Sequence, residues 1–261
     1  EFWLASAAWG DRPYLIYQDE VVSYAEAHAQ ANAVAAWLVE QGVQPGDRVA
    51  IAMRNYPEWL LIYWACVSVG IAVVGMNAWW VTEEIDYALK DSAPKVVFAD
   101  KERLAQILER PEMAKRQTLV GVRLDGPQAG IIPFAEVVGS GGTLPDVTVD
   151  PDADACIFYT SGTTGFPKGA QLTHRGCVSN LFNMMFCGQA QVLATQRATG
   201  VVPDPNVAPP IPVSLLTTPL FHVTANNCGA YATTAGGGTI VLMYRWDAGE
   251  ALKLIERERV T

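Results

Sequence analysis

Brief apolar runs alternate with segments that carry helix-start and helix-stop signals along most of this chain. Short apolar strands that alternate with helices are typical of mostly parallel sheets covered by helices on both faces, so the pattern predicts an α/β fold. We expect strands at 14–17, 21–23, 48–53, 71–76, 95–99, 117–123, 155–159, 213–217 and 238–243, and helices at 24–41, 58–69, 82–92, 101–110, 175–187, 224–234 and 248–259.

Local signals fix several of these boundaries. Ser23 and Glu26 have the spacing of a capping box, in which each side chain binds the other residue's free backbone amide. The helix that they open is expected to stop at Gly42. We expect Asn55 to cap the next helix, with Pro57 in its first turn.

A proline-rich segment divides the chain. Five prolines fall between 203 and 212, so we predict that 190–212 is a loop or lid-like insertion. The strands before and after it lead us to place 1–41 and 213–261 in one subdomain and 42–189 in the other.

The stretch from Trp59 to Thr82 carries no charged residue and is long enough to raise the question of a membrane span. Gly70, Gly75 and Asn77 interrupt it where a spanning helix would be continuous. We therefore predict a buried helix followed by a short strand, and no transmembrane segment.

Composition narrows the function classes. The chain has 261 residues, of which 50% are hydrophobic and 17% charged, as expected of a globular protein with a substantial core. A net charge of −9 argues against a nucleic-acid partner. The five cysteines form no C-x-x-C pair and have no neighbouring histidines, so we expect no metal site and free thiols in a reducing cytoplasm.

The stretch 159–174 carries the strongest chemical signal. Glycines let backbone N–H groups approach a ligand, and hydroxyl groups with these amides form a nest for anionic oxygens. The stretch holds the only Lys or Arg between Leu124 and His174, a span that contains six carboxylates. Its order differs from that of the kinase-type P-loop. We predict a phosphate-binding loop made by Thr160, Ser161, Gly162, Thr163, Thr164, Gly165, Lys168 and Gly169.

This string closely resembles the signature of the adenylate-forming superfamily, which includes acyl-CoA synthetases, firefly-type luciferases and the adenylation domains of peptide synthetases. Other segments resemble the same superfamily: 43–50, Asn55 with Pro57, 70–74, 82–87, 219–222 and 237–243. The likeness covers nearly the whole chain, and 190–212 is its least typical part. It implies the incomplete large N-terminal domain of that fold.

The resemblance also implies a role for His222. A lone histidine is more often a packed structural residue than a catalytic one, but Pro219-Leu-Phe-His222 resembles a second motif of the superfamily. In that motif the residue lines the site between the acyl carboxylate and the α-phosphate. We therefore predict catalytic roles for His222 and Lys168. His28 and His174 are interpreted as structural.

By this resemblance the full enzyme activates a carboxylic acid, fatty or aryl, with ATP and Mg²⁺ as an acyl-adenylate, and then transfers the acyl group to coenzyme A. The superfamily's adenine-binding stretch, Mg²⁺-binding glutamate and C-terminal domain have no counterpart here, so we expect this chain to be the front part of a longer enzyme. A peptide-synthetase adenylation domain and a non-catalytic nucleotide-binding half-protein are the alternatives. The sequence does not indicate the oligomeric state.

The composition of the predicted loop generates a first prediction. Three glycines and four hydroxyl residues have little to bury without nucleotide, so a nucleotide-free crystal structure should show weak density or the highest local B-factors across 162–168. A sharply ordered nucleotide-free loop, held by its own hydrogen bonds, would contradict this expectation.

Overall fold

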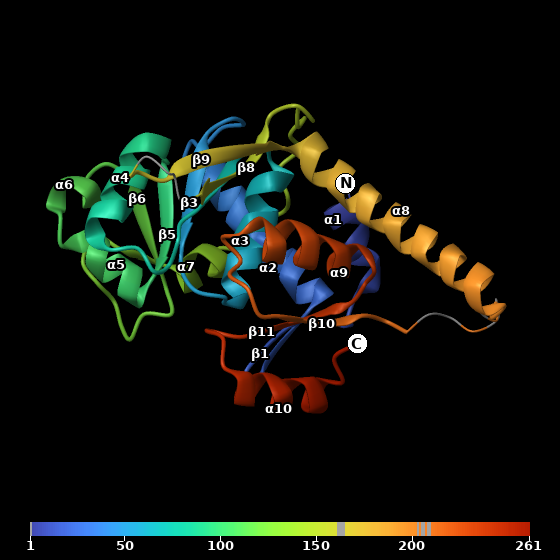
Figure 1. Cartoon of the computed structure of the whole chain (residues 1–261). Helices are drawn as coiled ribbons and strands as arrows, with labels where there is room; N and C mark the ends of the chain where they lie inside the picture. Colours follow the sequence, from blue (N-terminus) through green and yellow to red (C-terminus); the bar gives the residue numbers. More distant parts are fainter. Residues whose placement is uncertain (1, 161–164, 203, 205–206, 208–209) are drawn as a thin grey trace.

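Two β-sheets organise the fold (Figure 1). The computed structural model describes residues 2–160, 165–202, 204, 207 and 210–261. The strands in this part of the chain are β1 (Pro13–Tyr17), β2 (Glu20–Ser23), β3 (Arg48–Ala52), β4 (Ala72–Gly75), β5 (Val96–Asp100), β6 (Thr118–Val122), β7 (Ile132–Pro133), β8 (Asp154–Thr160), β9 (Lys168–Thr173), β10 (Val213–Leu216) and β11 (Thr239–Leu242).

The larger sheet has the strand order β7-β6-β5-β3-β4-β8-β9, and the smaller sheet has the order β10-β11-β1-β2. Every neighbouring pair is parallel except β8 with β9 and β1 with β2. The predicted fold class is therefore confirmed, with one antiparallel strand at an edge of each sheet.

Helices follow most strands, as the alternation predicted. The capping box at Ser23 is present, with the Ser23 hydroxyl accepting from the Glu26 amide. The helical segments are α1 (Phe2–Ala5), the 3-10 turn η1 (Ser6–Trp9), α2 (Tyr24–Glu40), α3 (Pro57–Ser68), α4 (Thr82–Ser92), α5 (Lys101–Leu108), α6 (Pro111–Ala114), α7 (Phe134–Gly139), α8 (His174–Thr199), the π-helix η2 (Thr224–Ala230), α9 (Tyr231–Ala235) and α10 (Ala248–Glu258).

Helices cover both faces of the larger sheet, and alternation along β3 shows why. Successive strand residues point to opposite faces. Val49 and Ile51 join the buried cluster that contains the side chains of α2 and α3. Ala50 and Ala52 join a second cluster with residues of α4 and α5. Because both faces are buried, the central strands are apolar throughout, which explains why they appear as continuous runs in the sequence.

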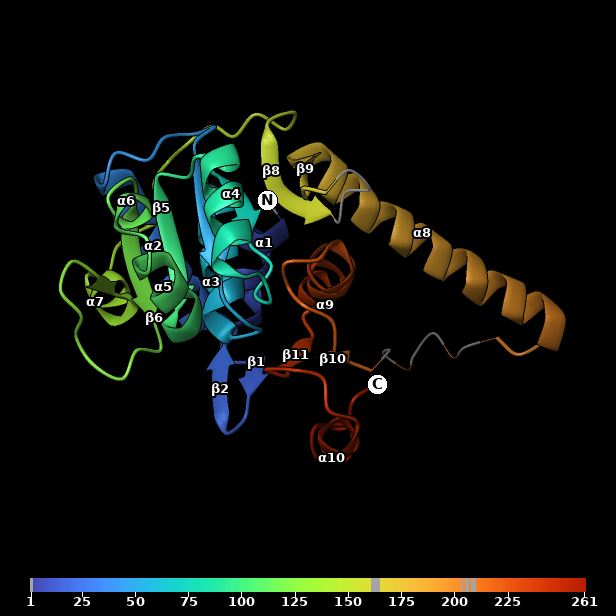
Figure 2. The same ribbon diagram turned by 60° about the vertical axis from the view of Figure 1, so that its left-hand side comes forward.

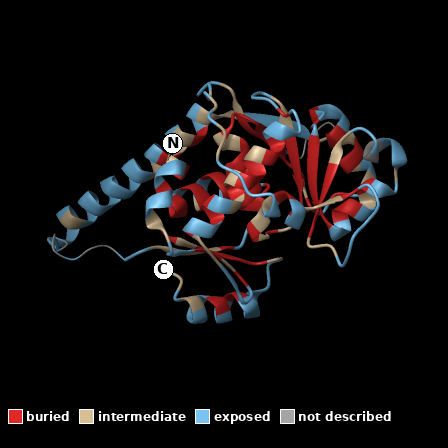
Figure 3. Ribbon diagram, turned by 180° about the vertical axis from the view of Figure 1, so that it is seen from behind, coloured by how far each residue is buried: buried red, intermediate tan, exposed pale blue. Residues whose placement is uncertain are grey.

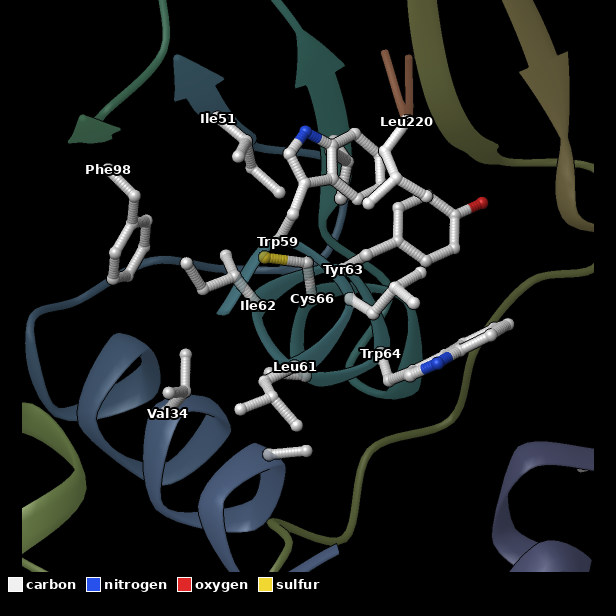
Figure 4. Close-up of a cluster of buried hydrophobic side chains, with 14 of the residues drawn as sticks. Val34, Ile51, Trp59, Leu61, Ile62, Tyr63, Trp64, Cys66, Phe98 and Leu220 are labelled. Atoms are coloured by element: carbon white, nitrogen blue, oxygen red, sulfur yellow. The ribbon is translucent and has the colours of Figure 1, made fainter. Parts of the chain in front are cut away.

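Helix α3 is buried on all sides. Its side chains from Trp59 to Cys66 are at most 1% exposed, and Figure 4 shows them between strands of the larger sheet and α2. A helix that is apolar all round is stable only where it is enclosed. The predicted buried helix is thus confirmed. Within the described ranges, no helix has the length and apolarity needed to cross a membrane.

The smaller sheet lies between α10 and the helices of the core (Figure 2). Val241 of β11 and Met243, which follows this strand, pack with Ala251 and Leu254 of α10. Its opposite face is joined to α3 by a buried hydrogen bond of 2.7 Å from the Trp64 indole N–H to the Tyr14 hydroxyl. The buried residues therefore run continuously from one sheet to the other (Figure 3).

The predicted loop 190–212 is wrong over its first ten residues. Helix α8 continues to Thr199 and ends at Gly200, which adopts the left-handed conformation with φ of 72°. Residues 189–199 contain alanine, leucine, glutamine and arginine, all strong helix formers, and no proline. The prolines that suggested a loop all lie beyond this helix. In Figures 1 and 2, α8 extends away from both sheets.

The chain crosses between the two sheets twice. Strands of the smaller sheet come from the segments 13–23 and 213–242, and those of the larger sheet come from 48–173. Helix α2, which follows the segment 13–23 of the smaller sheet, nevertheless packs against α3 and α7 of the other part. The division into subdomains 1–41 with 213–261 and 42–189 remains a proposal, and its boundary at 189 falls inside α8.

The buried His28 generates a prediction of pH dependence. Its ring stacks on Trp3 with centroids 3.9 Å apart, and its Nε2 lies 3.0 Å from the Ser6 hydroxyl. Burial lowers the pKa of His28. The unfolded chain therefore binds a proton more readily than the folded chain, and stability is lost as the pH falls below about 6.5.

We expect His28→Gln to lower the unfolding free energy at pH 7 by roughly 1–3 kcal/mol and to flatten its decline between pH 7 and 5. Urea unfolding across this pH range measures both quantities. His222→Gln, at an exposed position, serves as the control. An unchanged pH dependence in His28→Gln would contradict the assignment of this decline to His28.

Candidate active site

The predicted phosphate loop connects two antiparallel strands, β8 and β9. Thr160 at the end of β8 faces Lys168 at the start of β9, and Tyr159 faces Gly169. The Thr160 hydroxyl donates to the Lys168 carbonyl over 3.3 Å. The hairpin thus places Thr160 and Lys168 directly opposite each other at the base of the loop.

Lys168 is exposed and forms no ion pair with any residue that the structure describes. The carboxylates closest to it in sequence have other partners. Asp154 accepts from the Gln171 amide at 2.8 Å, and Asp152 pairs with Arg175 at 2.7 Å. The charge of Lys168 is therefore available to an anionic ligand, which fits the residue to phosphate binding.

Two glycines of the predicted set have steric or conformational roles. A Cβ atom at Gly169 would lie 2.9 Å from the Ile157 side chain, so a larger residue there would push the hairpin apart. Gly165 has a φ of 99°, which side-chain-bearing residues rarely adopt. The other predicted residues, Ser161, Gly162, Thr163 and Thr164, lie outside the described residues.

Two side-chain contacts join this hairpin to helix α4. The Phe166 ring stacks on Tyr87 of α4, with centroids 4.9 Å apart. The Tyr159 hydroxyl donates to Asp91 of the same helix over 2.7 Å. Burial raises the pKa of Tyr159, so this hydroxyl stays protonated as a donor. Helix α4 therefore supports both ends of the phosphate loop.

His222 lies on the segment that follows β10. Its backbone N–H donates to the Pro219 carbonyl over 3.0 Å, and its own carbonyl accepts from Asn226 in η2 over 3.0 Å. The side chain is exposed, and within the described part of the chain its ring has no hydrogen-bond partner. A packed core histidine would be enclosed, so the geometry favours a residue that is open to a ligand.

Asn55 fixes this segment to the larger sheet. Its amide donates to the Thr218 carbonyl over 2.9 Å, and its side-chain oxygen accepts from the Leu220 N–H over 2.9 Å. The expectation that Asn55 caps α3 is wrong, because the N-cap is Tyr56, without a side-chain bond. Asn55 instead joins two motifs that lie 163 residues apart in sequence.

Close packing brings the same segment onto β4. A Cβ atom at Gly75 would lie 2.6 Å from the Phe158 ring and 3.3 Å from the Phe221 backbone. A larger residue at Gly75 would therefore clash with the Phe158 ring and crowd the Phe221 backbone. Since β4 and β8 are neighbours, the His222 segment lies at the strand next to the phosphate hairpin.

Two consecutive tryptophans after β4 contact both predicted motifs, a role that the sequence did not reveal. Trp79 packs edge-on against Phe221 with centroids 5.2 Å apart, and Trp80 packs against Tyr159 at 5.4 Å. One therefore lies beside the residue that precedes His222, and the other beside the residue that precedes Thr160. The sequence signal that could have revealed this role is a pair of bulky aromatic residues shortly after a buried strand.

All these elements meet at the carboxyl ends of parallel strands. Asn55 follows β3, Trp79 follows β4, Thr160 ends β8, and His222 follows β10. Ligands of open α/β sheets bind at this edge. Among the residues described, no three His, Cys, Asp or Glu side chains are grouped to hold a metal ion. The arrangement thus fits phosphate binding and supplies no cluster for a metal.

A hairpin that carries an exposed lysine at the carboxyl edge of an α/β sheet fits the class of enzymes that handle nucleotides. Comparison with known proteins identifies the family. Residues 2–261 match the family model of the AMP-binding enzymes. The chain therefore belongs to the AMP-binding enzyme family.

Relatives in this family include CoA ligases. The chain is 32% identical over 241 residues to a feruloyl-CoA synthase of Amycolatopsis sp, covering 92% of this chain and 42% of that protein. It is 30% identical over 251 residues to 4-coumarate–CoA ligase 2 of Oryza sativa subsp. japonica, with coverage of 92% and 42%. The chain thus spans less than half the length of these curated relatives.

Solved structures show the same fold. An O-succinylbenzoate coenzyme A synthetase from Bacillus subtilis, in complex with AMP, is 25% identical with a TM-score of 0.72, covering 100% of this chain and 60% of the other. The inhibitor-bound N-terminal domain of FACL13 from Mycobacterium tuberculosis is 26% identical with a TM-score of 0.77, with coverage of 99% and 60%.

The double hydrogen bond of Asn55 generates a prediction. Asn55→Ala leaves the Leu220 N–H, which is buried, and the Thr218 carbonyl without their partner, and should lower the unfolding free energy by about 1–3 kcal/mol. Denaturant unfolding measures this loss. Gln189→Ala, on the exposed surface of α8, is the control and should change stability by less than about 0.5 kcal/mol. Equal effects of the two variants would show that Asn55 does not anchor the His222 segment.

Proposed function

We propose that the protein carrying this chain activates a carboxylic acid with ATP and transfers the acyl group to coenzyme A. The observation that carries this proposal is the exposed Lys168, which has no ion pair among the described residues and lies opposite Thr160 on the hairpin, while the exposed His222 segment lies at the neighbouring strand β4. Membership of the AMP-binding enzyme family supports it. So do the relatives named feruloyl-CoA synthase and 4-coumarate–CoA ligase, whose names specify an acid and CoA.

The first half-reaction makes an acyl-adenylate. A carboxylate oxygen of the acid attacks the α-phosphorus of ATP, the bond from that phosphorus to the β-bridging oxygen breaks, and pyrophosphate leaves. Thr160 and the loop residues Ser161, Thr163 and Thr164 position the phosphates, and Gly162, Gly165 and Gly169 allow backbone amides to approach them. Lys168 offsets the negative charge that grows on the departing pyrophosphate. A structure of the related O-succinylbenzoate coenzyme A synthetase from Bacillus subtilis in complex with ATP and magnesium supports the use of ATP.

The second half-reaction makes a thioester. The coenzyme A sulfur attacks the acyl carbon, the bond from that carbon to the adenylate oxygen breaks, AMP leaves, and the thiol proton passes to solvent. His222 orients the acyl group for this attack. Mg²⁺, when bound, would neutralise phosphate charge.

The acid is proposed to be fatty or aryl. The aryl acids named in the relatives favour the aryl class. The CoA ligases among the relatives also favour CoA ligation over the two alternatives, a peptide-synthetase adenylation domain and a non-catalytic binding protein. The five cysteines are free thiols, which supports the proposal of a cytoplasmic, reducing location.

The separate roles of Lys168 and His222 generate a prediction for the full-length protein. Lys168→Met keeps the side-chain length but removes the charge, and should slow adenylate formation by roughly 10–1000-fold. Thioester formation from supplied adenylate should be nearly unchanged. His222→Ala should slow both half-reactions, the second at least as strongly.

Single-turnover kinetics of each half-reaction measure these effects. Lys253→Met is a matched control, because this lysine lies on the exposed face of α10 and its one ion pair among the described residues is with Glu250, at 3.6 Å. If Lys168→Met slowed both steps equally and His222→Ala slowed neither, the hairpin would be a structural turn. His222 would then have no part in the reaction.

A further inference from the structure

The Arg54 guanidinium lies against two aromatic rings at the edge of the site. Its central carbon is 4.5 Å from the centre of the Trp79 ring and 5.5 Å from that of Tyr244. The three residues come from different places, because Arg54 follows β3, Trp79 follows β4, and Tyr244 follows β11 of the smaller sheet. The contact therefore joins both sheets at their carboxyl ends.

The rings of Trp79 and Tyr244 restrain this guanidinium. Its Nε and Nη1 atoms are buried and have no hydrogen-bond partner among the described residues. The backbone N–H of Arg54 donates to Asp100 over 3.1 Å, which fixes the main chain but not the side chain. The Tyr244 hydroxyl in turn donates to Glu102 over 3.0 Å. A planar cation that lies on aromatic faces restrains the rings as well as itself.

Trp79 is held on two sides and open on the third. Besides Arg54, it contacts Phe221 edge-on at 5.2 Å, and its backbone N–H donates to the Asn77 side chain over 2.9 Å. Its side chain nevertheless remains 55% exposed. Exposure of so large an indole contributes little to stability, but it places a rigid aromatic surface beside the residue that precedes His222.

We propose that Arg54 is a positioning residue, which fixes the Trp79 indole as a wall of the space beside His222. This inference rests on the proposed function. In the larger sheet, β3 lies on the side of β4 opposite to β8, so Arg54 follows a strand that is not next to the phosphate hairpin. Trp79 contacts Phe221, the residue before His222. The reactant that this wall is proposed to guide is therefore the one at His222, the acid or the thiol, rather than the ATP phosphates.

The competing interpretation is that Arg54 only ties the two sheets together. Arg54→Met keeps the aliphatic stem but removes the charged plane, and Arg54→Lys keeps a charge without the plane. Arg12→Met is a matched control, because Arg12 lies 4.6 Å above the ring of Trp9, in a pair outside the site.

Fluorine NMR of the full-length protein labelled with 5-fluorotryptophan tests the positioning directly. Trp79 is one of eight tryptophans in this chain, and Trp79→Phe assigns its resonance by loss of the signal. Arg54→Met should shift and narrow the Trp79 resonance as the indole gains freedom, with a smaller change in Arg54→Lys. Arg12→Met should leave that resonance unchanged. A Trp79 resonance that is unchanged in Arg54→Met would overturn the proposal.

Steady-state kinetics of the same variants test the consequence. In Arg54→Met, kcat/KM for the acid or for the thiol should fall by about 3–30-fold through KM, with kcat changed by less than about 3-fold, because the reactant is guided less well. Trp79→Leu should affect the same reactant, and Arg12→Met should affect neither. A fall in kcat alone, or equal losses for every reactant, would mean that Arg54 is only structural.

The proposed function and the positioning role of Arg54 can fail independently of each other. A wild-type protein that forms no adenylate from any carboxylic acid would refute the proposed function, whereas the fluorine spectrum would still decide whether Arg54 positions Trp79. If Arg54→Met does not fold, the comparison of Arg54→Lys with Trp79→Leu decides the proposal by the same criteria.

Discussion

The burial of helix α3 is the constraint on which the rest of this structure depends. An apolar helix from Pro57 to Ser68 has no face that is suited to water, so it must be enclosed. The larger sheet and α2 cover one part of it, and Tyr14 and Tyr231, from the smaller sheet and α9, cover another through hydrogen bonds to Trp64 and Tyr63. Each sheet therefore buries its inner face against the same helix, which fixes the position of one sheet relative to the other.

The fixed position of one sheet relative to the other brings the residues of the candidate site together. The residues that follow β3, β4 and β8 lie at the carboxyl ends of strands of the larger sheet, and the segment after β10 of the smaller sheet reaches them through Asn55 and Phe221. Asn55 shows the connection most directly, because it begins the turn into α3 and also binds the segment before His222. The same turn that leads into the buried helix thus holds a predicted catalytic residue in place.

The charged and polar side chains at this edge differ in how tightly their neighbours hold them, and these differences match the roles proposed for them. Arg54 is enclosed by aromatic rings, and Arg103 forms a buried ion pair with Asp100. Lys168 and His222 are exposed. Buried charges with fixed partners maintain the shape of the edge, whereas an exposed ammonium and an exposed imidazole remain free to meet a ligand. A preorganised frame with a few open groups is the arrangement that electrostatic catalysis requires.

The sequence by itself determined the α/β class, most helices and strands, and the capping box at Ser23, because these depend on local periodicity and capping. The phosphate loop with Lys168 is a prediction from residue order. It misjudged the extent of α8, where helix propensity continues past Gly188 to Gly200. Only the tertiary structure decided that Asn55 binds the segment before His222, that Gly75 admits Phe221, and that Arg54 lies on Trp79 and Tyr244. Those contacts join residues from separate elements, most of them far apart in sequence. The packing of both sheets around one helix creates them, and no local pattern encodes that packing.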